Sequence, residues 1–250
     1  MKRKFGINTI AYQKYLKEGM SQSELLPHIQ SCGAQIAEIR REWIRGEQLE
    51  RIAKCARESS LTLYYSVPAQ LFENGSLNLV FLQGLIDEAN RLEAKAIKLT
   101  LGDSRGAADS DIERLCQLSR QSARQILVEN DQSGASGDAE LLDAFFKRQN
   151  VADSGIALTF DTGNFLAAGF DPVECANRFS AKTDWIHLKD ISKTSGVASV
   201  ALLGEGEVDI PAILSLMRKE TPAAIEYPCG DYEQVRAQTQ KAIALLSEFD

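Results

Sequence analysis

Basic residues are fewer than acidic residues in this chain of 250 residues. There are 28 lysines and arginines against 35 acidic residues, and the net charge is −7. No cluster of basic residues follows a helix or loop, so nucleic acid is not an expected partner. No apolar run reaches the ~18 residues of a membrane span, and the basic start MKRKFGINTI lacks the apolar core and cleavage site of a secretory signal. We therefore expect a soluble, cytoplasmic protein without a membrane partner.

Cysteine and histidine are also scarce. The five cysteines are odd in number and scattered, and no C-x-x-C pair occurs, which argues against a disulfide framework and against a zinc–thiolate site. Only His28 and His187 are present. His28 lies in the helical segment ELLPHIQSCG and lacks the inward strand position of His187 and its Trp and Lys neighbours, so we interpret it as a surface or packing residue. No Pro-, Ser- or Gly-rich stretch is long enough to link two domains.

Strand-like runs alternate with amphipathic helical patterns along the chain. The first helical segment opens with Ser21 and Glu24 in a capping-box pattern. This alternation is typical of parallel βαβ units. The chain length and strand number predict an α/β protein with a single domain over residues 1–250, a parallel (β/α)8 barrel. The eight predicted strands lie near residues 4–10, 35–40, 61–67, 96–102, 125–131, 156–162, 184–191 and 223–227.

Four residues that bind hard metal ions stand at the ends of successive predicted strands. Glu129 lies in ILVEND, Asp161 in LTFDTGN, His187 in WIHLKD and Glu226 in AIEYP, separated by 32, 26 and 39 residues. Because each interval is about one strand–helix unit, a barrel would bring all four to the same rim. Three carboxylates and one imidazole favour one divalent ion, either Mn²⁺, Mg²⁺ or Co²⁺, and also admit Zn²⁺.

Side-chain parity supports a polar site inside the barrel. Alternate residues of a barrel strand face inward and outward, and one parity of these strands carries apolar residues such as Ile97, Val128 and Ile186. The other parity is too polar for a packed interior, where each unpaired charge is costly. We therefore expect it to line a site for a metal and a polar ligand. This set comprises Asn8, Glu38, Arg40, Tyr64, Ser66, Lys98, Thr100, Glu129, Asp161, His187, Lys189 and Glu226.

Each candidate also has a structural interpretation. A single glutamate such as Glu129 at a strand end is usually part of a salt bridge, and His187 taken alone could be a hydrogen-bonded core residue. Lys189 could simply neutralise the carboxylates, and Arg40 could pair with a neighbouring glutamate. For Lys189 and Arg40, structural and substrate-binding roles are equally open.

The order and spacing of ILVEND, FDTGN, HLKD, the G-x-G turn in LLGEGEVDIPAIL, and IEYP resemble the xylose isomerase-like TIM barrels. That family includes sugar isomerases and epimerases, inosose and dehydroshikimate dehydratases, and endonuclease IV. The resemblance implies that Glu129, Asp161, His187 and Glu226 ligate the metal, and that Glu129 and Glu226 also act as acid and base on opposite faces of the substrate. Asn164 stands where several relatives carry histidine, so the role of that histidine does not transfer.

A weaker resemblance concerns the early stretch AEIRREW, which contains Glu38 and Arg40. It is similar to the E-L-R-E-E pattern of 2-ketogluconate-utilisation epimerases, which suggests an acidic keto-sugar as substrate. Endonuclease IV uses several more histidines than this chain has, so its three-metal site cannot be assembled here.

The leading hypothesis is a divalent-metal-dependent isomerase or epimerase of a small keto-sugar or keto-sugar acid, acting through an enediolate. Lys189, Asn164, Arg40 and Glu38 would contact the substrate. Two alternatives stay open: a metal-dependent lyase of the dehydroshikimate or keto-inositol dehydratase type, and a non-catalytic barrel that binds a sugar acid. A homo-oligomer is also left open.

Overall fold

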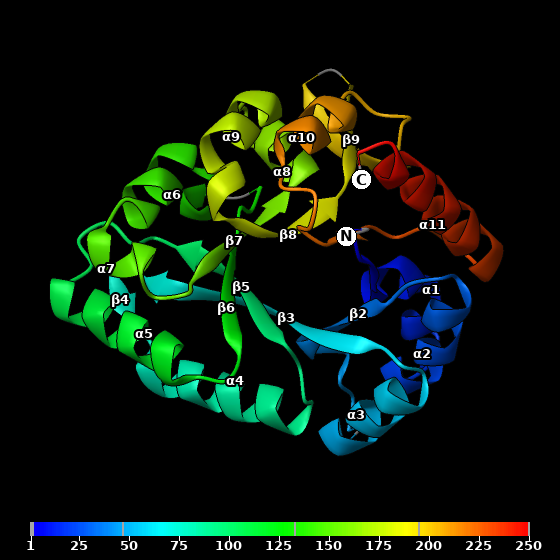
Figure 1. Ribbon diagram of the computed structural model, residues 1–250, viewed down its shortest axis with the longest axis horizontal. Coiled ribbons are helices and arrows are strands. Elements are labelled where there is room, and N and C mark those ends of the chain that lie inside the picture. Colours follow the sequence, from blue (N-terminus) through cyan, green and yellow to red (C-terminus); the bar gives the residue numbers. More distant parts are fainter. Residues whose placement is uncertain (1–2, 47, 133, 195, 250) are drawn as a thin grey trace.

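The described residues of the computed structural model, 3–46, 48–132, 134–194 and 196–249, form a closed barrel of eight parallel strands within a ring of helices (Figure 1). The strands follow one another around the barrel in the order β2, β1, β11, β8, β7, β6, β5 and β3, and pairing of β2 with β3 closes it. Their bounds are β1 (Phe5–Asn8), β2 (Ile36–Arg40), β3 (Thr62–Glu73), β5 (Ala96–Gly102), β6 (Gln125–Glu129), β7 (Ala157–Asp161), β8 (Thr183–Leu188) and β11 (Ala223–Ile225).

A helix connects each barrel strand to the next, and α11 follows the last strand. The predicted capping box is confirmed at the start of α2, where the Ser21 backbone N–H donates to the Glu24 carboxylate at 2.9 Å. The longer helices are α2 (Gln22–Ser31), α3 (Leu49–Glu58), α4 (Leu79–Arg91), α5 (Asp109–Gln121), α6 (Ala139–Phe146), α9 (Pro172–Phe179), α10 (Ile210–Leu216) and α11 (Tyr232–Ser247). The shorter ones are α1 (Gln13–Lys17), α7 (Gln149–Ala152) and α8 (Thr162–Ala167). Among the described residues, no helix combines the length and the apolar character needed to cross a membrane.

Two hydrophobic clusters lie on opposite faces of the barrel wall. The predicted outward parity is confirmed, because its residues, such as Ile97 and Val128, pack with the helices in the larger cluster. A smaller cluster fills the lower interior of the barrel. Its members are Ile36, Tyr64, Ala96, Leu127, Ala157, Trp185 and Ala224. The polar inward residues therefore stand above an apolar floor.

The third strand is longer than the prediction of 61–67. Pro68 directly follows the predicted end, and proline donates no hydrogen bond to a sheet. In the structure Pro68 lies where the register between β3 and β5 shifts, so no ladder bond is lost there, and β3 continues to Glu73. A two-residue turn, Asn74-Gly75, with positive φ at both residues, then leads into β4 (Ser76–Leu77), which pairs antiparallel with the end of β3.

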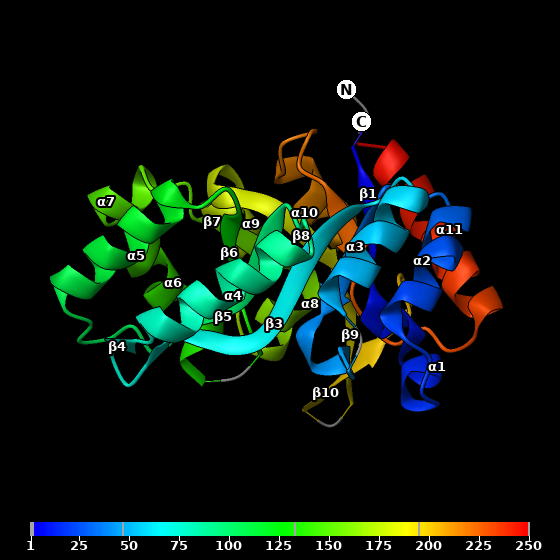
Figure 2. The ribbon, with the colours of Figure 1, turned by 90° about the horizontal axis from the view of Figure 1, so that it is seen from below.

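The predicted strand at 184–191 is divided in two. The barrel strand ends at Leu188, and β9 (Asp190–Thr194) forms an antiparallel hairpin with β10 (Val197–Ala201). The buried Asp190 carboxylate accepts backbone N–H groups of Gly204, Gly206 and Val208 at 2.9 to 3.2 Å. These bonds hold the G-x-G turn beside the start of the hairpin. Figure 2 shows the hairpin at the end of the molecule opposite the chain termini, where the strands end.

Gly6 makes space for the largest side chain of the barrel interior. A Cβ at this position would lie 2.9 Å from Trp185 Cη2 and 3.0 Å from Ile36 Cβ. We therefore expect Gly6→Val to destabilise the protein by about 2 kcal/mol through overpacking, measured by urea unfolding. Gly84→Ala on helix α4 is the control, since its added Cβ meets nothing within 4 Å apart from its chain neighbours and the backbone of its own helix. It should stabilise by about 0.5–1 kcal/mol. Equal stability of Gly6→Val and the wild type would contradict the packing argument.

Candidate metal and substrate site

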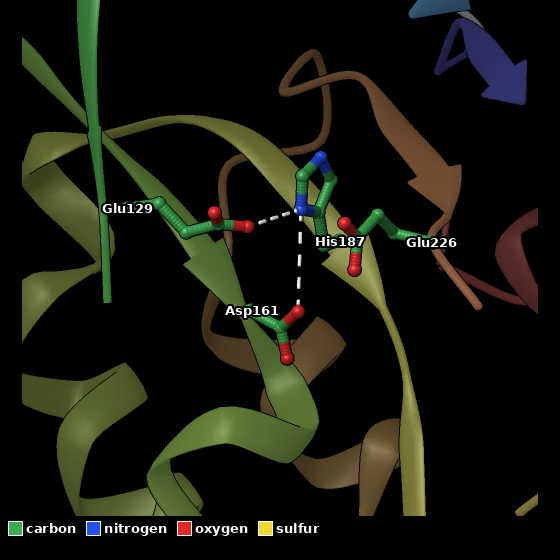
Figure 3. A group of neighbouring side chains, drawn as sticks. All are labelled: Glu129, Asp161, His187 and Glu226. Atoms are coloured by element: carbon green, nitrogen blue, oxygen red, sulfur yellow. Dashed lines mark hydrogen bonds and ion pairs between the residues drawn. The ribbon is translucent and has the colours of Figure 1, made fainter. Parts of the chain in front are cut away.

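Glu129, Asp161, His187 and Glu226 converge at the C-terminal end of the barrel (Figure 3). Glu129 and Asp161 are the last residues of β6 and β7, His187 is next to last in β8, and Glu226 directly follows β11. Each offers one ligand atom, and these atoms all lie within 4.8 Å of one another. All four residues are buried. The carboxyl ends of parallel strands meet at one rim, which is why residues far apart in sequence meet here.

The His187 ring is held between two carboxylates. Its Nδ1 atom lies 2.6 Å from Glu129 Oε1 and faces the cluster, whereas Nε2 lies 2.7 Å from Oε2 of the buried Glu38. The Trp185 indole nitrogen is 3.2 Å from the same Glu38 oxygen and 2.9 Å from Nε2. Because Nε2 donates to Glu38, the indole N–H is satisfied by that carboxylate. Burial opposes the charge on the ring, but Glu38 and Glu129 outweigh burial and raise the pKa of His187 to about 10.

Asp161 has one oxygen engaged by the backbone and one facing the cluster. Oδ1 caps helix α8 by accepting the N–H groups of Gly163 and Asn164, both at 2.9 Å. The buried Oδ2 accepts no hydrogen bond of good geometry, although the Lys189 ammonium lies 2.7 Å away. A Cβ on Gly163 would lie 2.7 Å from Ile191 Cγ1, so glycine permits the close approach of β9.

Three cations contact the carboxylates of the cluster. Lys189 lies between Asp161 and Glu226, with its Nζ 2.6 Å from Glu226 Oε2. Arg40 binds the other oxygen of Glu226 at 2.8 Å, and Lys98 binds Glu129 Oε2 at 2.5 Å. Burial raises the pKa of Glu226, but Lys189 in particular outweighs this and holds it at about 2. Lys98 and His187 likewise overcome burial and hold the pKa of Glu129 well below its usual range.

Asn164 and Glu38, which were also expected to contact the substrate, lie at different depths in the barrel. Asn164 Oδ1 is 3.5 Å from Lys189 Nζ, and its amide nitrogen donates to the Asn130 carbonyl oxygen at 2.9 Å. Glu38 lies beneath His187 without any exposed surface. Lys98 was given no role from sequence, although its inward parity placed it in the same polar set.

The cluster fits a divalent metal ion by its own chemistry. Its donors are oxygens of Glu129, Asp161 and Glu226 and a nitrogen of His187, at mutual distances that one ion can span. The Asp161 atom in this set is the buried Oδ2, which has no hydrogen-bond donor of good geometry and so can serve as a ligand. Such a set suits Mn²⁺, Mg²⁺ or Co²⁺ and also admits Zn²⁺. Lys189 would then lie next to the ion, and Glu38 would orient the imidazole.

The lowered pKa values of the cluster carboxylates predict that the metal-free protein loses stability in acid. Glu226 has a folded pKa of about 2 against an ordinary value of 4.5. Its contribution to stability is therefore fully present above pH 4.5 and is lost as the pH falls from 4.5 through about 2. Thermal unfolding in EDTA across this range should show the decline, and Glu226→Gln should make it shallower. Parallel pH profiles for the two proteins would contradict the assignment.

Comparison with known proteins agrees with this architecture. Residues 26–249 match the family model described as xylose isomerase-like TIM barrel. No curated protein sequence gives a significant match. Among solved structures, the IOLI protein with a binding zinc atom aligns with a TM-score of 0.79 at 15% identity, covering 99% of this chain and 99% of that one.

Two further aligned structures are those of an epimerase and of a probable dehydratase. L-ribulose 3-epimerase aligns with a TM-score of 0.75 at 14% identity, covering 99% of this chain and 95% of that one. The probable 3-DHS dehydratase AsbF from Bacillus anthracis aligns with a TM-score of 0.73 at 16% identity, covering 96% and 98%. At these identities the likeness establishes the fold. The match over most of the chain, together with the closed parallel barrel, shows that this protein belongs to the xylose isomerase-like TIM barrel family.

Proposed function

We propose that the protein is a divalent-metal-dependent isomerase or epimerase of a small keto-sugar or keto-sugar acid. The observation that carries this proposal is the buried set of four donor atoms within 4.8 Å at the C-terminal end of the barrel. A divalent ion bound there would polarise a substrate carbonyl and acidify the neighbouring C–H bond. Glu129, Asp161, His187 and Glu226 would hold it. We also propose that residues 1–250 act as one domain.

Glu129 and Glu226 are the proposed acid and base. Figure 3 shows their carboxylates entering the cluster from opposite sides, so they can reach opposite faces of a substrate between them. Lys98 on Glu129, and Lys189 with Arg40 on Glu226, favour the ionised carboxylates, which are the forms that accept a proton. One carboxylate would remove the proton next to the carbonyl, giving an enediolate. The other would return a proton to the opposite face for epimerisation, or the proton would move to the adjacent carbon for isomerisation.

The remaining polar residues take supporting roles in this proposal. Lys189 and Arg40 contact Glu226, Asn164 contacts Lys189, and all three would contact the substrate. Glu38 lies on the far side of the imidazole, so we propose that it orients His187 through Nε2 in place of the substrate contact expected from sequence.

A lyase is the second candidate. The likeness of the fold to the probable 3-DHS dehydratase supports it. In that reaction the same base would remove the proton, and the resulting enolate would expel a β-hydroxyl group protonated by the second carboxylate.

The test is a screen of keto-sugars and keto-acids in D₂O with added Mn²⁺, followed by proton NMR. Deuterium uptake at a carbon next to the carbonyl, with formation of an epimer or isomer, is the expected result. A new vinyl signal would identify the lyase. The EDTA-treated protein is the control and should be inactive. Absence of exchange and of product on every compound, with metal bound, would leave only the ligand-binding alternative.

A further inference from the structure

Charged side chains of both signs are packed at the barrel mouth. The carboxylates of Glu38, Glu129, Asp161 and Glu226 are buried, and the cations in contact with them are Lys98, Lys189 and Arg40. Apart from His187, which lies between Glu38 and Glu129, four negative charges thus face three positive ones. Glu42 also contacts Arg40, but its side chain is 32% exposed, so water screens its charge.

A divalent ion would leave the charges at the barrel mouth out of balance by one positive unit. A histidine that ligates a metal is neutral, so the loaded cluster would carry one positive charge in excess. An uncompensated buried charge is costly, and an anionic ligand removes that cost. A neutral ketose would leave the excess charge in place.

Two of the cations are positioned for such an anion. Arg40 and Lys189 hold the two oxygens of the Glu226 carboxylate at 2.8 and 2.6 Å, so their spacing matches one carboxylate group. Their side chains are 17% and 13% exposed, whereas that of Lys98 is 6% exposed. Arg40 and Lys189 therefore lie nearer to solvent, on the side from which a substrate arrives.

A phosphate group is a poorer fit to the same rim. The G-x-G turn is the glycine-rich loop closest in sequence to Lys189, and its backbone N–H groups would be the usual phosphate donors. Those of Gly204, Gly206 and Val208 already donate to Asp190. The turn also carries Glu205 and Glu207, which repel an anion of higher charge.

We propose that the substrate is a carboxylic acid, an acidic keto-sugar or a related keto-acid, whose carboxylate is bound by Lys189 and Arg40. This inference rests on the proposed function for the metal site and narrows its substrate class. It predicts discrimination against neutral ketoses of the same length.

The direct test compares two six-carbon probes on the Mn²⁺-loaded protein by titration calorimetry. 2-Keto-D-gluconate and D-fructose share a carbonyl at C2 and differ at C1, which is a carboxylate in one and a hydroxymethyl group in the other. We expect the acid to bind at least about tenfold more tightly, as charge-assisted hydrogen bonds to two cations imply. Lys189→Met should weaken binding of the acid more than binding of D-fructose, so that the two dissociation constants become similar. Lys54→Met on helix α3, 68% exposed, is the matched control.

Glu42→Gln provides a second variant should Lys189→Met fail to fold. It frees Arg40 from a competing carboxylate, so we expect it to strengthen binding of the acid without affecting D-fructose. Equal or tighter binding of D-fructose by the wild type, or no binding of the acid at about 10 mM, would overturn the inference. Turnover of neutral ketoses alone would overturn it while leaving the proposed function intact. Binding of acids through Lys189 without turnover of any compound would instead count against the proposed function.

Discussion

His187→Ala is expected to lower Mn²⁺ affinity about 100-fold or more. Loss of a residue that only orients a metal ligand typically lowers affinity by about 10- to 100-fold, and loss of the ligand itself should cost at least as much. The ring supplies the single nitrogen among the four donor atoms, and its Nδ1 faces Glu129 and Asp161. Asp161→Asn should act in the same direction, since the amide replaces a charged oxygen with a neutral group. Titration calorimetry with Mn²⁺ measures both effects.

The barrel itself should survive this substitution. The neighbours Ile186 and Leu188 face the helices and pack in the larger hydrophobic cluster, so β8 keeps its place. The metal-free variant should nevertheless unfold at a lower temperature, because Glu38 and Glu129 lose a buried partner. Circular dichroism distinguishes this modest loss from unfolding.

His28→Ala is the matched control for the metal. His28 stacks on Tyr232 with ring centroids 4.1 Å apart, and it lies in helix α2 rather than at a strand end. Its removal should leave Mn²⁺ affinity unchanged. If His187→Ala bound the ion as tightly as the wild type did, the cluster would not be the metal site. If the wild type bound none of Mn²⁺, Mg²⁺, Co²⁺ and Zn²⁺, the metal assignment would be wrong altogether.

The sequence was sufficient to predict which residues would meet, because barrel geometry leaves little freedom. Residues of one parity at the ends of successive parallel strands must share a rim, and Glu129, Asp161 and His187 satisfy that condition. Glu226, one residue beyond its strand, does so as well. Strand ends could be located because apolar runs stop where the polar rim begins.

The contacts within the rim were harder to predict. Parity places Lys98 and Glu38 inside the barrel, but it does not say that Lys98 reaches Glu129 on the adjacent strand or that Glu38 reaches His187 across the barrel. Those contacts depend on rotamers and on the tilt of the strands. The two hairpins were missed for different reasons. The predicted third strand stopped at residue 67, short of the turn at Asn74-Gly75, whereas continuous strand-like sequence concealed the break between β8 and β9 before Asp190.

Glu129→Gln and Glu226→Gln are each expected to reduce turnover by about 10³-fold or more, because an amide keeps the shape of the carboxylate but cannot accept a proton. The two variants should differ in partial reactions. With one carboxylate removed, the other can still exchange the substrate proton with solvent on the face that it contacts. In D₂O the two variants should therefore incorporate deuterium into different epimers, as detected by proton NMR.

Metal content has to be measured in both variants, since each changes a proposed ligand as well as a proposed base. Metal analysis at saturating Mn²⁺ separates the two effects, and only loaded protein is compared. Glu205→Gln, an exposed glutamate of the G-x-G turn, is the control and should retain full turnover. A lyase would show no epimer-selective exchange in either variant. If both loaded variants turned the substrate over at near the wild-type rate, Glu129 and Glu226 would act as ligands only. The acid and base would then have to be sought among the other groups at the rim, beginning with Lys189, which contacts both Asp161 and Glu226.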